Sequence, residues 1–277
     1  MLFLGLGIIS RSENSEVGVF ACRDNDGASG KMRNCEDWRP SKYVRKNGRL
    51  VASRDPNEVG ISSRLVADRA AEYYDANLKL HAKGRLLDLG CGKVPLYDAY
   101  RKYVTDIICI DWEHSLHKNN HLDFEADLTK ALPFLDGEFN TIILSDVLEH
   151  IPEPDPFCRE MARVLSPGGK LIMNVPFYYW LHEQPHDYYR YTEFALRRFM
   201  ERSGMRVLQL QAIGGSPEVL ADVFAKNVKR LPIVGTPVAM LSQWAISTLT
   251  RTPIGRRFSA ATGRTFPLGY FLVAVKE

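Results

Sequence analysis

The sequence predicts an α/β fold: a doubly wound, mostly parallel sheet of seven strands with helices on both faces and an antiparallel last strand. Short apolar runs alternate with segments whose apolar residues recur at helical spacing, as repeated βα units do. The run Leu86–Leu89 ends in the glycine turn 90–92, and the run Ile107–Asp111 closes with an acid about 20 residues later. Such a unit binds a nucleoside, because glycine lets backbone N–H groups approach the ligand and the acid accepts hydrogen bonds from a ribose.

The composition fits one mid-sized enzyme. The chain has 277 residues, 45% hydrophobic and 25% charged, which is enough to bury a full core. Its net charge of +3 is too small to indicate a polyanion, and no basic stripe with interleaved aromatic residues occurs, so nucleic acid is not an expected partner. The five cysteines form no CxxC pair, which argues against a disulfide framework or a zinc cluster and favours a reducing, cytoplasmic compartment. The apolar residues 1–9 lack a basic region and fall short of the roughly 20 residues of a spanning helix, so neither a signal peptide nor a span is expected.

The region before the core divides into an arm and a hairpin with a helix. After the first nine residues, the segment 1–36 is mainly polar and charged without an apolar period, so we expect a disordered arm. Within residues 37–83, Asn47-Gly48 supplies the two positive-φ positions of a tight turn and predicts a hairpin over Tyr43–Val51. Apolar residues at near-helical spacing predict a helix over Ser62–Leu80.

The core, residues 84–213, continues as alternating strands and helices. A helix is expected to begin at Pro95, because proline suits the first helical turn. Another is expected to open with Asp155 as N-cap and Pro156 at the first helical position, and to stop at residues 166–169. The remaining predicted strands are His121–Glu125, Phe139–Ser145, Lys170–Val175, Met205–Leu210 and, in the final segment 264–277, Gly269–Val275.

Residues 214–263 form an insertion between the sixth and seventh strands. Its part 231–249 is largely uncharged and is flanked by basic residues: Lys226, Lys229 and Arg230 before it, Arg251, Arg256 and Arg257 after it. One interpretation is a buried helical cap over the active site. The other is an apolar face in peripheral contact with the inner side of a membrane, its basic flanks attracted to anionic lipids.

Two departures from a dinucleotide-binding unit narrow the choice of ligand class. Pro95 takes the place of the third glycine, and Asp88 lies inside the first strand. A carboxylate at that position would repel a pyrophosphate but attract the cationic amino acid end of S-adenosylmethionine (SAM). A nicotinamide-dependent dehydrogenase is therefore disfavoured.

Five blocks in the expected order resemble those of class I SAM-dependent methyltransferases of the type-11 group, over residues 85–210 plus the final strand. The blocks are Leu86–Gly92, Asp111, Asp127-Leu128, Ser145–Ile151 and Arg163–Leu171. The resemblance implies a Rossmann-like sheet and SAM as the cofactor.

The resemblance also implies which residues bind the cofactor. Asp88, Gly90 and Gly92 would serve the methionine moiety and its turn, with Asp111 on the ribose and Asp127 and Leu128 on the adenine. Cys91 and Ser145 are assigned to the same site. Trp112 either stacks on the adenine or belongs to the core.

The segment His182–His186 matches the HExxH pattern of zinc proteases, but Pro185 defeats the continuous helix that such a site requires, so no metal is predicted. We place the segment in the loop after the fifth strand, over the methyl group of the cofactor. His182–Tyr191 also resembles a segment of bacterial methyltransferases from surface-polysaccharide loci. A hydroxyl acceptor needs a base, and the candidates are His182, His186 and Asp187. His150 is either a further catalytic residue or a structural histidine.

These observations predict a SAM-dependent methyltransferase that acts on a small-molecule or glycan acceptor, at oxygen rather than at nitrogen or carbon. The oligomeric state is left open. A quinone-like or other lipid is the alternative acceptor, favoured by the apolar insertion and the type-11 resemblance. A non-catalytic binding or scaffold subunit is the alternative from another class, and the presence of Asp88 and Asp111 together argues against it.

Overall fold

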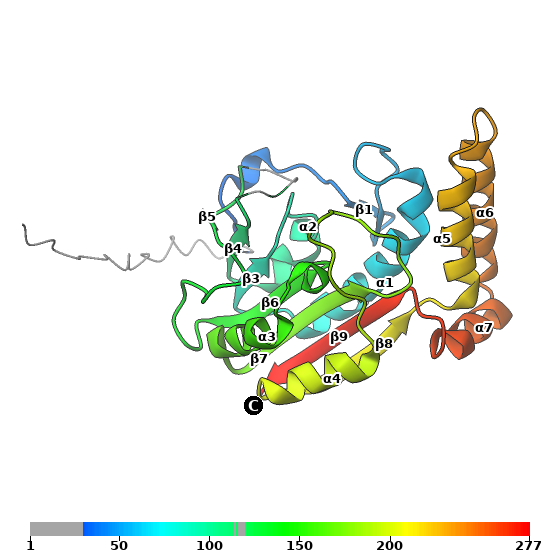
Figure 1. The fold of residues 1–277 in the computed structure, drawn as a ribbon. Helices are drawn as coiled ribbons and strands as arrows, with labels where there is room; N and C mark the ends of the chain where they lie inside the picture. Colours follow the sequence, from blue (N-terminus) through cyan, green and yellow to red (C-terminus); the bar gives the residue numbers. More distant parts are fainter. Residues whose placement is uncertain (1–29, 114, 116–119) are drawn as a thin grey trace, which may run out of the picture.

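The computed structural model describes residues 30–113, 115 and 120–277. Within them, the main sheet has seven strands in the order β5-β4-β3-β6-β7-β9-β8 (Figure 1). Neighbouring strands from β5 to β7 are parallel, and β9 runs antiparallel between β7 and β8, which confirms the predicted fold class. The strands are β3 (Arg85–Leu89), β4 (Asp106–Asp111), β5 (Phe124–Glu125), β6 (Phe139–Ser145), β7 (Leu165–Pro176), β8 (Met205–Ile213) and β9 (Gly269–Lys276).

Successive residues of the central strands point to two separate cores, because side chains alternate along a strand. Leu86 and Ile107 belong to the core under α1 (Arg64–His81), whereas Leu87 and Ile110 belong to the core under α3 (Pro154–Val164) and α4 (Glu193–Arg202). The strands are therefore apolar on both faces. The sheet lies between two helical layers, as Figure 1 shows.

The predicted hairpin is confirmed. Strands β1 (Tyr43–Lys46) and β2 (Arg49–Ala52) pair antiparallel, and the turn residues Asn47 and Gly48 have φ of 51° and 75°. The short helix η2 (Ile61–Ser63) then leads into α1.

The prediction of a disordered arm over residues 1–36 is wrong for its last residues. Residues 1–29 lie outside the described residues, but 30–36 pack on the core. Met32 is 2% exposed, and the Gly30 N–H donates to the carbonyl of Val104 at 2.8 Å. The segment continues into η1 (Cys35–Asp37). A single buried methionine and hydrogen bonds to backbone carbonyls anchor it, and neither produces a periodic apolar pattern.

Three element boundaries also differ from the prediction. The strand expected from His121 is only β5, because residues 121–123 turn toward β4 and the Asp123 carboxylate accepts from the Cys109 N–H at 2.8 Å. Helix α3 begins two residues early, with Glu153 as N-cap and Pro154 at the first position. Pro95 precedes only one helical turn, α2 (Tyr97–Tyr100), followed by η3 (Arg101–Tyr103).

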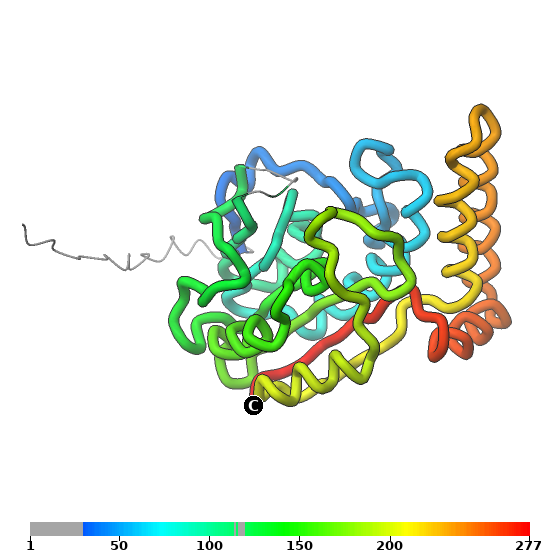
Figure 2. The backbone as a smooth tube through the Cα atoms, viewed as in Figure 1, coloured from blue at the N-terminus to red at the C-terminus, as the bar shows by residue number. Residues whose placement is uncertain are grey.

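The insertion consists of α5 (Ser216–Val228), α6 (Gly235–Leu249) and α7 (Pro253–Gly263). Helices α5 and α6 form a hairpin beside α1 at one side of the molecule, with α7 at its foot (Figures 1 and 2). The interpretation as a buried cap is wrong, because α6 buries only Gly235, Ala239 and Gln243. Among the described residues, no helix combines the length and the hydropathy that crossing a bilayer requires.

The packing of residues 30–36 is tested by Met32→Ala. The cavity left in the core is expected to lower the free energy of unfolding by about 2–4 kcal/mol, measured by urea denaturation. The matched control is Met240→Ala on α6, where the side chain is 48% exposed and the expected loss is below about 1 kcal/mol. Equally small losses in both variants would contradict the packing of this segment.

Candidate functional site

The turn after β3 has the backbone geometry of a ligand-binding loop. Gly90 and Gly92 have φ of 66° and 51°, the left-handed region that favours glycine. The N–H groups of Gly90 and Cys91 donate to the carbonyl of Ile110 at 2.9 and 3.1 Å. A Cβ on Gly90 would come within 2.6 Å of the Val147 side chain. Glycine at position 90 therefore brings the loop close against the end of β6.

Two buried carboxylates lie beside this turn, Asp88 near the end of β3 and Asp111 at the end of β4. Asp88 is 4% exposed, and the hydroxyl of Tyr100 donates to it at 2.8 Å. Burial, and to a lesser degree the charge of Asp111, raise the pKa of Asp88 to about 7. The carboxylate of Asp111 accepts from the N–H groups of Gly92 at 3.1 Å and Trp112 at 2.8 Å. Asp111 thereby fixes the glycine turn.

Trp112 lies at the surface rather than in the core. Its side chain is 36% exposed, and its ring meets that of His186 edge-on, with centroids 5.1 Å apart. A hollow of about 260 Å³ opens beside it, lined by Asp111, Trp112, Glu113, Ser115, Asn120, Leu122 and Glu125. The described residues thus leave room next to Asp111 for a planar ring.

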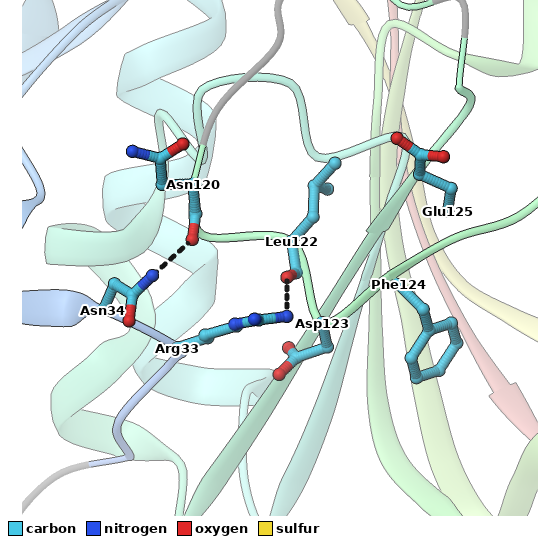
Figure 3. Close-up of a pocket in the computed structure, with 7 residues that line it drawn as sticks. All are labelled: Arg33, Asn34, Asn120, Leu122, Asp123, Phe124 and Glu125. Atoms are coloured by element: carbon cyan, nitrogen blue, oxygen red, sulfur yellow. Dashed lines mark hydrogen bonds between the residues drawn. The ribbon is translucent and has the colours of Figure 1, made fainter.

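A second hollow, of about 480 Å³, adjoins the first and shares Asn120, Leu122 and Glu125 with it. Arg33 and Asn34 close one side of it by donating to the carbonyls of Leu122 at 3.2 Å and Asn120 at 2.8 Å (Figure 3). Neither hollow is lined by Asp127 or Leu128. Leu128 is buried in the core, and the Asp127 carboxylate accepts from Thr129 at 2.6 Å and pairs with Lys130 at 3.2 Å.

A chain of polar groups fixes the ends of β6 and β7. Asp146 has φ of 53° and pairs with Lys42 at 2.6 Å. The Asn174 amide donates to Asp146 at 2.5 Å, while its oxygen accepts from the hydroxyls of Tyr74 at 2.6 Å and Ser145 at 3.0 Å. The side chain of Ser145 is therefore engaged within the protein.

Behind Asp146, the short helix η4 (Leu148–His150) presents a buried acid and a histidine. Glu149 is fully buried, and neither carboxylate oxygen has a hydrogen-bond partner among the described residues. Burial, then the charge of Asp146, raise the pKa of Glu149 well above its ordinary value. Nε2 of His150 and Nε2 of His182 each lie 3.8 Å from Oε1 of Glu149. The three side chains form one cluster. Each offers one atom that could hold a metal ion, and these atoms lie within 4.8 Å of one another.

The tautomers of both histidines follow from their other ring nitrogens. Nδ1 of His150 lies 2.8 Å from the carbonyl of His186, and Nδ1 of His182 lies 3.3 Å from both the Trp180 carbonyl and the Asp187 carboxylate. Since these oxygens only accept, each Nδ1 carries the hydrogen. The Nε2 atoms of both rings lie on the side of Glu149. Burial, then His150, lower the pKa of His182, so its ring is neutral at neutral pH.

The HExxH segment is not helical. Pro185 follows a cis peptide bond, and no helix forms between β7 and α4. His186 lies apart from the cluster, with Nδ1 3.1 Å from the hydroxyl of Tyr188. His186 is therefore not part of the group that brings His182 together with Glu149 and His150.

Asp187 holds the loop between β7 and α4 in place. Its carboxylate accepts from Arg190 at 2.5 and 2.8 Å and from the N–H of His182 at 2.9 Å. Burial alone would raise the pKa of Asp187, but the hydrogen bonds from Arg190 and the His182 N–H lower it to about 2. Arg190 also donates to the carbonyl of Trp180 at 3.0 Å, which ties both sides of the loop together.

Sequence reasoning missed Glu149, Lys42 and Asn174. Glu149 stands in the block Ser145–Ile151, so a signal existed in the acid directly before His150. Lys42 carried none, because its partner Asp146 lies 104 positions away.

Comparison with known proteins confirms the domain class. Residues 87–173 match the model of the methyltransferase domain family. One chain of the complex between the Haloferax volcanii Trm112 methyltransferase activator and a presumed methyltransferase shares the fold, with a TM-score of 0.50 and 18% identity, over 80% of this chain and 94% of that one. Residues 87–173 thus match a methyltransferase domain, and the chain shares the fold of that structure.

Two curated relatives resemble the same region. The ubiquinone biosynthesis O-methyltransferase of Xanthomonas euvesicatoria pv. vesicatoria (strain 85-10) is 32% identical over 116 residues, which are 37% of this chain and 47% of the relative. The demethylmenaquinone methyltransferase of Renibacterium salmoninarum is 32% identical over 94 residues, 32% of this chain and 40% of the relative. The chain therefore spans about half the length of the curated relatives it matches.

The role of Asp187 as the anchor of the loop is tested by Asp187→Asn. Loss of the charge-assisted bonds to Arg190 is expected to cost about 1.5–3 kcal/mol locally, so hydrogen exchange at residues 177–191 should accelerate about tenfold to a hundredfold. The control is Glu193→Gln, whose pairing with Arg197 at 3.7 Å is largely exposed. Unchanged exchange in the Asp187 variant would show that other contacts hold the loop.

Proposed function

We propose that the chain is a SAM-dependent methyltransferase whose cofactor lies across the carboxyl ends of β3, β4 and β6. The observation that carries the proposal is the pair of buried carboxylates, Asp88 and Asp111, on either side of the glycine turn. The Asp111 carboxylate can accept hydrogen bonds from the ribose hydroxyls, and the Asp88 carboxylate can pair with the α-ammonium of SAM. A pyrophosphate would be repelled by Asp88. The match of residues 87–173 to the methyltransferase domain family supports the same cofactor. A scaffold freed from SAM would gain nothing from burying both acids.

The cofactor residues take their roles from this placement. Asp111 accepts from the ribose hydroxyls, and the half-exposed ring of Trp112 covers the adenine in the adjoining hollow. Asp127 and Leu128 line neither hollow, so their assignment to the adenine stays a prediction from the sequence. Gly90, Cys91, Gly92 and Ser145 stay assigned to the methionine end, where Cys91 and Ser145 contribute backbone rather than side chain.

Methyl transfer is an in-line displacement at the methyl carbon. A bond from the acceptor atom to carbon forms as the carbon–sulfur bond breaks, its electron pair going to sulfur, and S-adenosylhomocysteine leaves. Positioning and exclusion of water supply much of the rate. We place the acceptor atom at the cluster of Glu149 and His150, which follow β6, and His182, which follows β7; a bound cofactor would have to present its methyl group to this cluster.

For a hydroxyl acceptor, which we favour, the proton must leave the oxygen. His182 is the base in this account, because it is neutral and its Nε2 atom lies in the cluster. The carbonyl oxygen of the Glu149 carboxyl beside it would accept a hydrogen bond from the Nε2–H that forms. His150 orients the cluster, and His186 stays a second candidate at the edge of the adenine site. Asp187 is already held as a carboxylate by Arg190, so we assign it a positioning role.

The acceptor class follows from the loop over this site. Tyr178, Trp180, Tyr188 and Tyr189 expose between 39% and 49% of their side chains there. Exposed aromatic rings among His, Asp and Arg side chains suit stacking on and hydrogen bonding to a sugar ring, so a small-molecule or glycan hydroxyl is our first candidate. A quinone-like or other lipid hydroxyl is the second, favoured by the two quinone-pathway names among the relatives. We place the reaction in the cytoplasm, since the four described cysteines are free.

SAM affinity is expected to depend on pH through Asp88. Below pH of about 7 the free protein holds Asp88 protonated, and the cofactor ammonium binds its carboxylate form, so binding must release a proton. Affinity should therefore rise by up to about tenfold for each pH unit from 5.5 toward 7, and then level off. Calorimetry at pH 6 in buffers of different ionisation enthalpy should detect the released proton. Asp88→Asn should bind SAM more weakly and without this pH dependence, and a wild-type affinity flat with pH would contradict the assignment.

Catalysis is tested with labelled SAM and extracts of cellular glycans and lipids, the products identified by mass spectrometry. His182→Gln is expected to slow methyl transfer by about a hundredfold or more while changing SAM affinity by less than about twofold. The control is His81→Gln at the end of α1, a histidine 3.0 Å from Lys170 and outside the cluster. Activity lost on dialysis against a chelator and restored by zinc would contradict His182 as the base, because the cluster would then be a metal site.

A further inference from the structure

Helix α6 is inverted with respect to an ordinary surface helix. Its buried side consists of Gly235, Ala239 and Gln243, spaced four residues apart. Gln243 accepts from the N–H of Leu65 at 2.9 Å and donates to the carbonyl of Ile61 at 2.8 Å. Its opposite side exposes Leu241 and Trp244 to 62% and 65%. A polar residue faces the protein and large apolar residues face outward, whereas a surface helix usually turns its apolar side to the core and its polar side to water.

Helix α5 shares part of this inversion. It buries Glu218, Asp222 and Lys226, again four residues apart, together with smaller apolar residues, and exposes Leu220, Val223 and Phe224. The buried charges have partners inside the protein: Lys226 pairs with Asp222, and Glu218 accepts from Ser259 at 2.8 Å and lies 3.5 Å from Arg69. Helix α5 thus keeps its acidic residues inside and exposes large apolar side chains.

Exposed large apolar side chains occur along the whole insertion. We define the docking unit as α5, α6, α7 and their connections, residues 216–266. It contributes more than half of the exposed large hydrophobic side chains of the described residues. They are Leu220, Val223, Phe224, Leu231, Ile233, Val234, Val238, Met240, Leu241, Trp244, Leu249, Ile254, Phe258 and Phe266. Ile233, between the two helices of the hairpin, is 96% exposed. Patches of this kind mark interaction sites.

The charge of the docking unit identifies its partner. From residue 223 to residue 276 the sequence has no Asp or Glu. The exposed charges are all basic: Lys229 and Arg230 between α5 and α6, and Arg251, Arg256, Arg257 and Arg264 around α7. Exposed hydrocarbon flanked by cations alone is complementary to an anionic lipid surface, which offers acyl chains and negative headgroups together. A second copy of the chain would bring the same cations against themselves.

We propose that the docking unit binds an anionic lipid bilayer peripherally, with the hairpin lying in the interface. The bound surface also adjoins the acceptor loop. The ammonium of Lys226 lies 3.6 Å from the ring centroid of Tyr179, and the rings of Phe266 and Tyr178 lie 6.1 Å apart. Docking itself is independent of the proposed function. Its consequence, that the acceptor is carried by or delivered from a membrane, rests on that function.

The test is flotation of the full chain with large unilamellar vesicles of equal phosphatidylglycerol and phosphatidylcholine, beside vesicles of phosphatidylcholine alone. We expect binding to the anionic vesicles at least about tenfold stronger than to the neutral ones, weakened by salt. The double variant Leu241→Glu with Trp244→Glu should lose at least about tenfold in binding. The pair Leu135→Glu with Phe194→Glu, 70% and 75% exposed outside the docking unit, is the matched control and should bind within about twofold of the wild type. Arg256→Gln with Arg257→Gln should lose about fivefold for each charge on anionic vesicles alone.

Calorimetric SAM binding without vesicles verifies the fold of every variant and reports separately on the proposed function. Intact SAM binding with no vesicle binding would overturn the docking proposal alone. Equal binding by the two glutamate pairs would also overturn it. Light scattering of the free protein covers the other occupant: a dimer that the Leu241 and Trp244 variant dissociates, with no vesicle binding, would show that a second copy covers this surface.

Discussion

The candidate site depends on the parallel register of β3, β4, β6 and β7. This register sets Leu89 beside Ile110 and Leu144, and Ser145 beside Asn174, so the four strands end at one edge of the sheet. Asp88, Asp111, Asp146 and the residues of η4 all gather there because each belongs to one of these strand ends. A side chain at the other edge would face the opposite end of the molecule. Topology, more than any single contact, therefore brings the acids to one place.

Some acids at this edge pair with a cation of the protein and others do not, and the second group fits a cationic cofactor. Asp146 pairs with Lys42 and Asp187 pairs with Arg190, so the charges of these two carboxylates are balanced within the protein. Asp88 and Glu149 are buried beside groups that do not neutralise a carboxylate, and burial raises the pKa of both. A buried acid in this condition stays protonated or binds a positive charge. The ammonium and sulfonium of SAM supply positive charges next to these positions in our account.

Local chemistry explains which features the sequence could predict. Asn47-Gly48, Gly90 and the apolar strands are determined by backbone sterics and alternation, so the hairpin, the turn and the sheet follow from adjacent residues. The cluster of Glu149 with His182 and the pair of Lys42 with Asp146 join segments far apart in sequence, and no local pattern encodes such a distance. The insertion shows a third case. Its apolar and acid-free composition was visible, but its inversion was not, because a periodic pattern does not reveal which side of a helix faces the protein.

The most direct test of the account is a crystal structure with S-adenosylhomocysteine bound. We predict that the ribose hydroxyls contact Asp111, that the α-ammonium contacts Asp88, and that the sulfur faces His182 across the end of β6. Binding with the sulfur turned away from the Glu149 cluster, or with the adenosine distant from Asp111 and Trp112, would contradict the account.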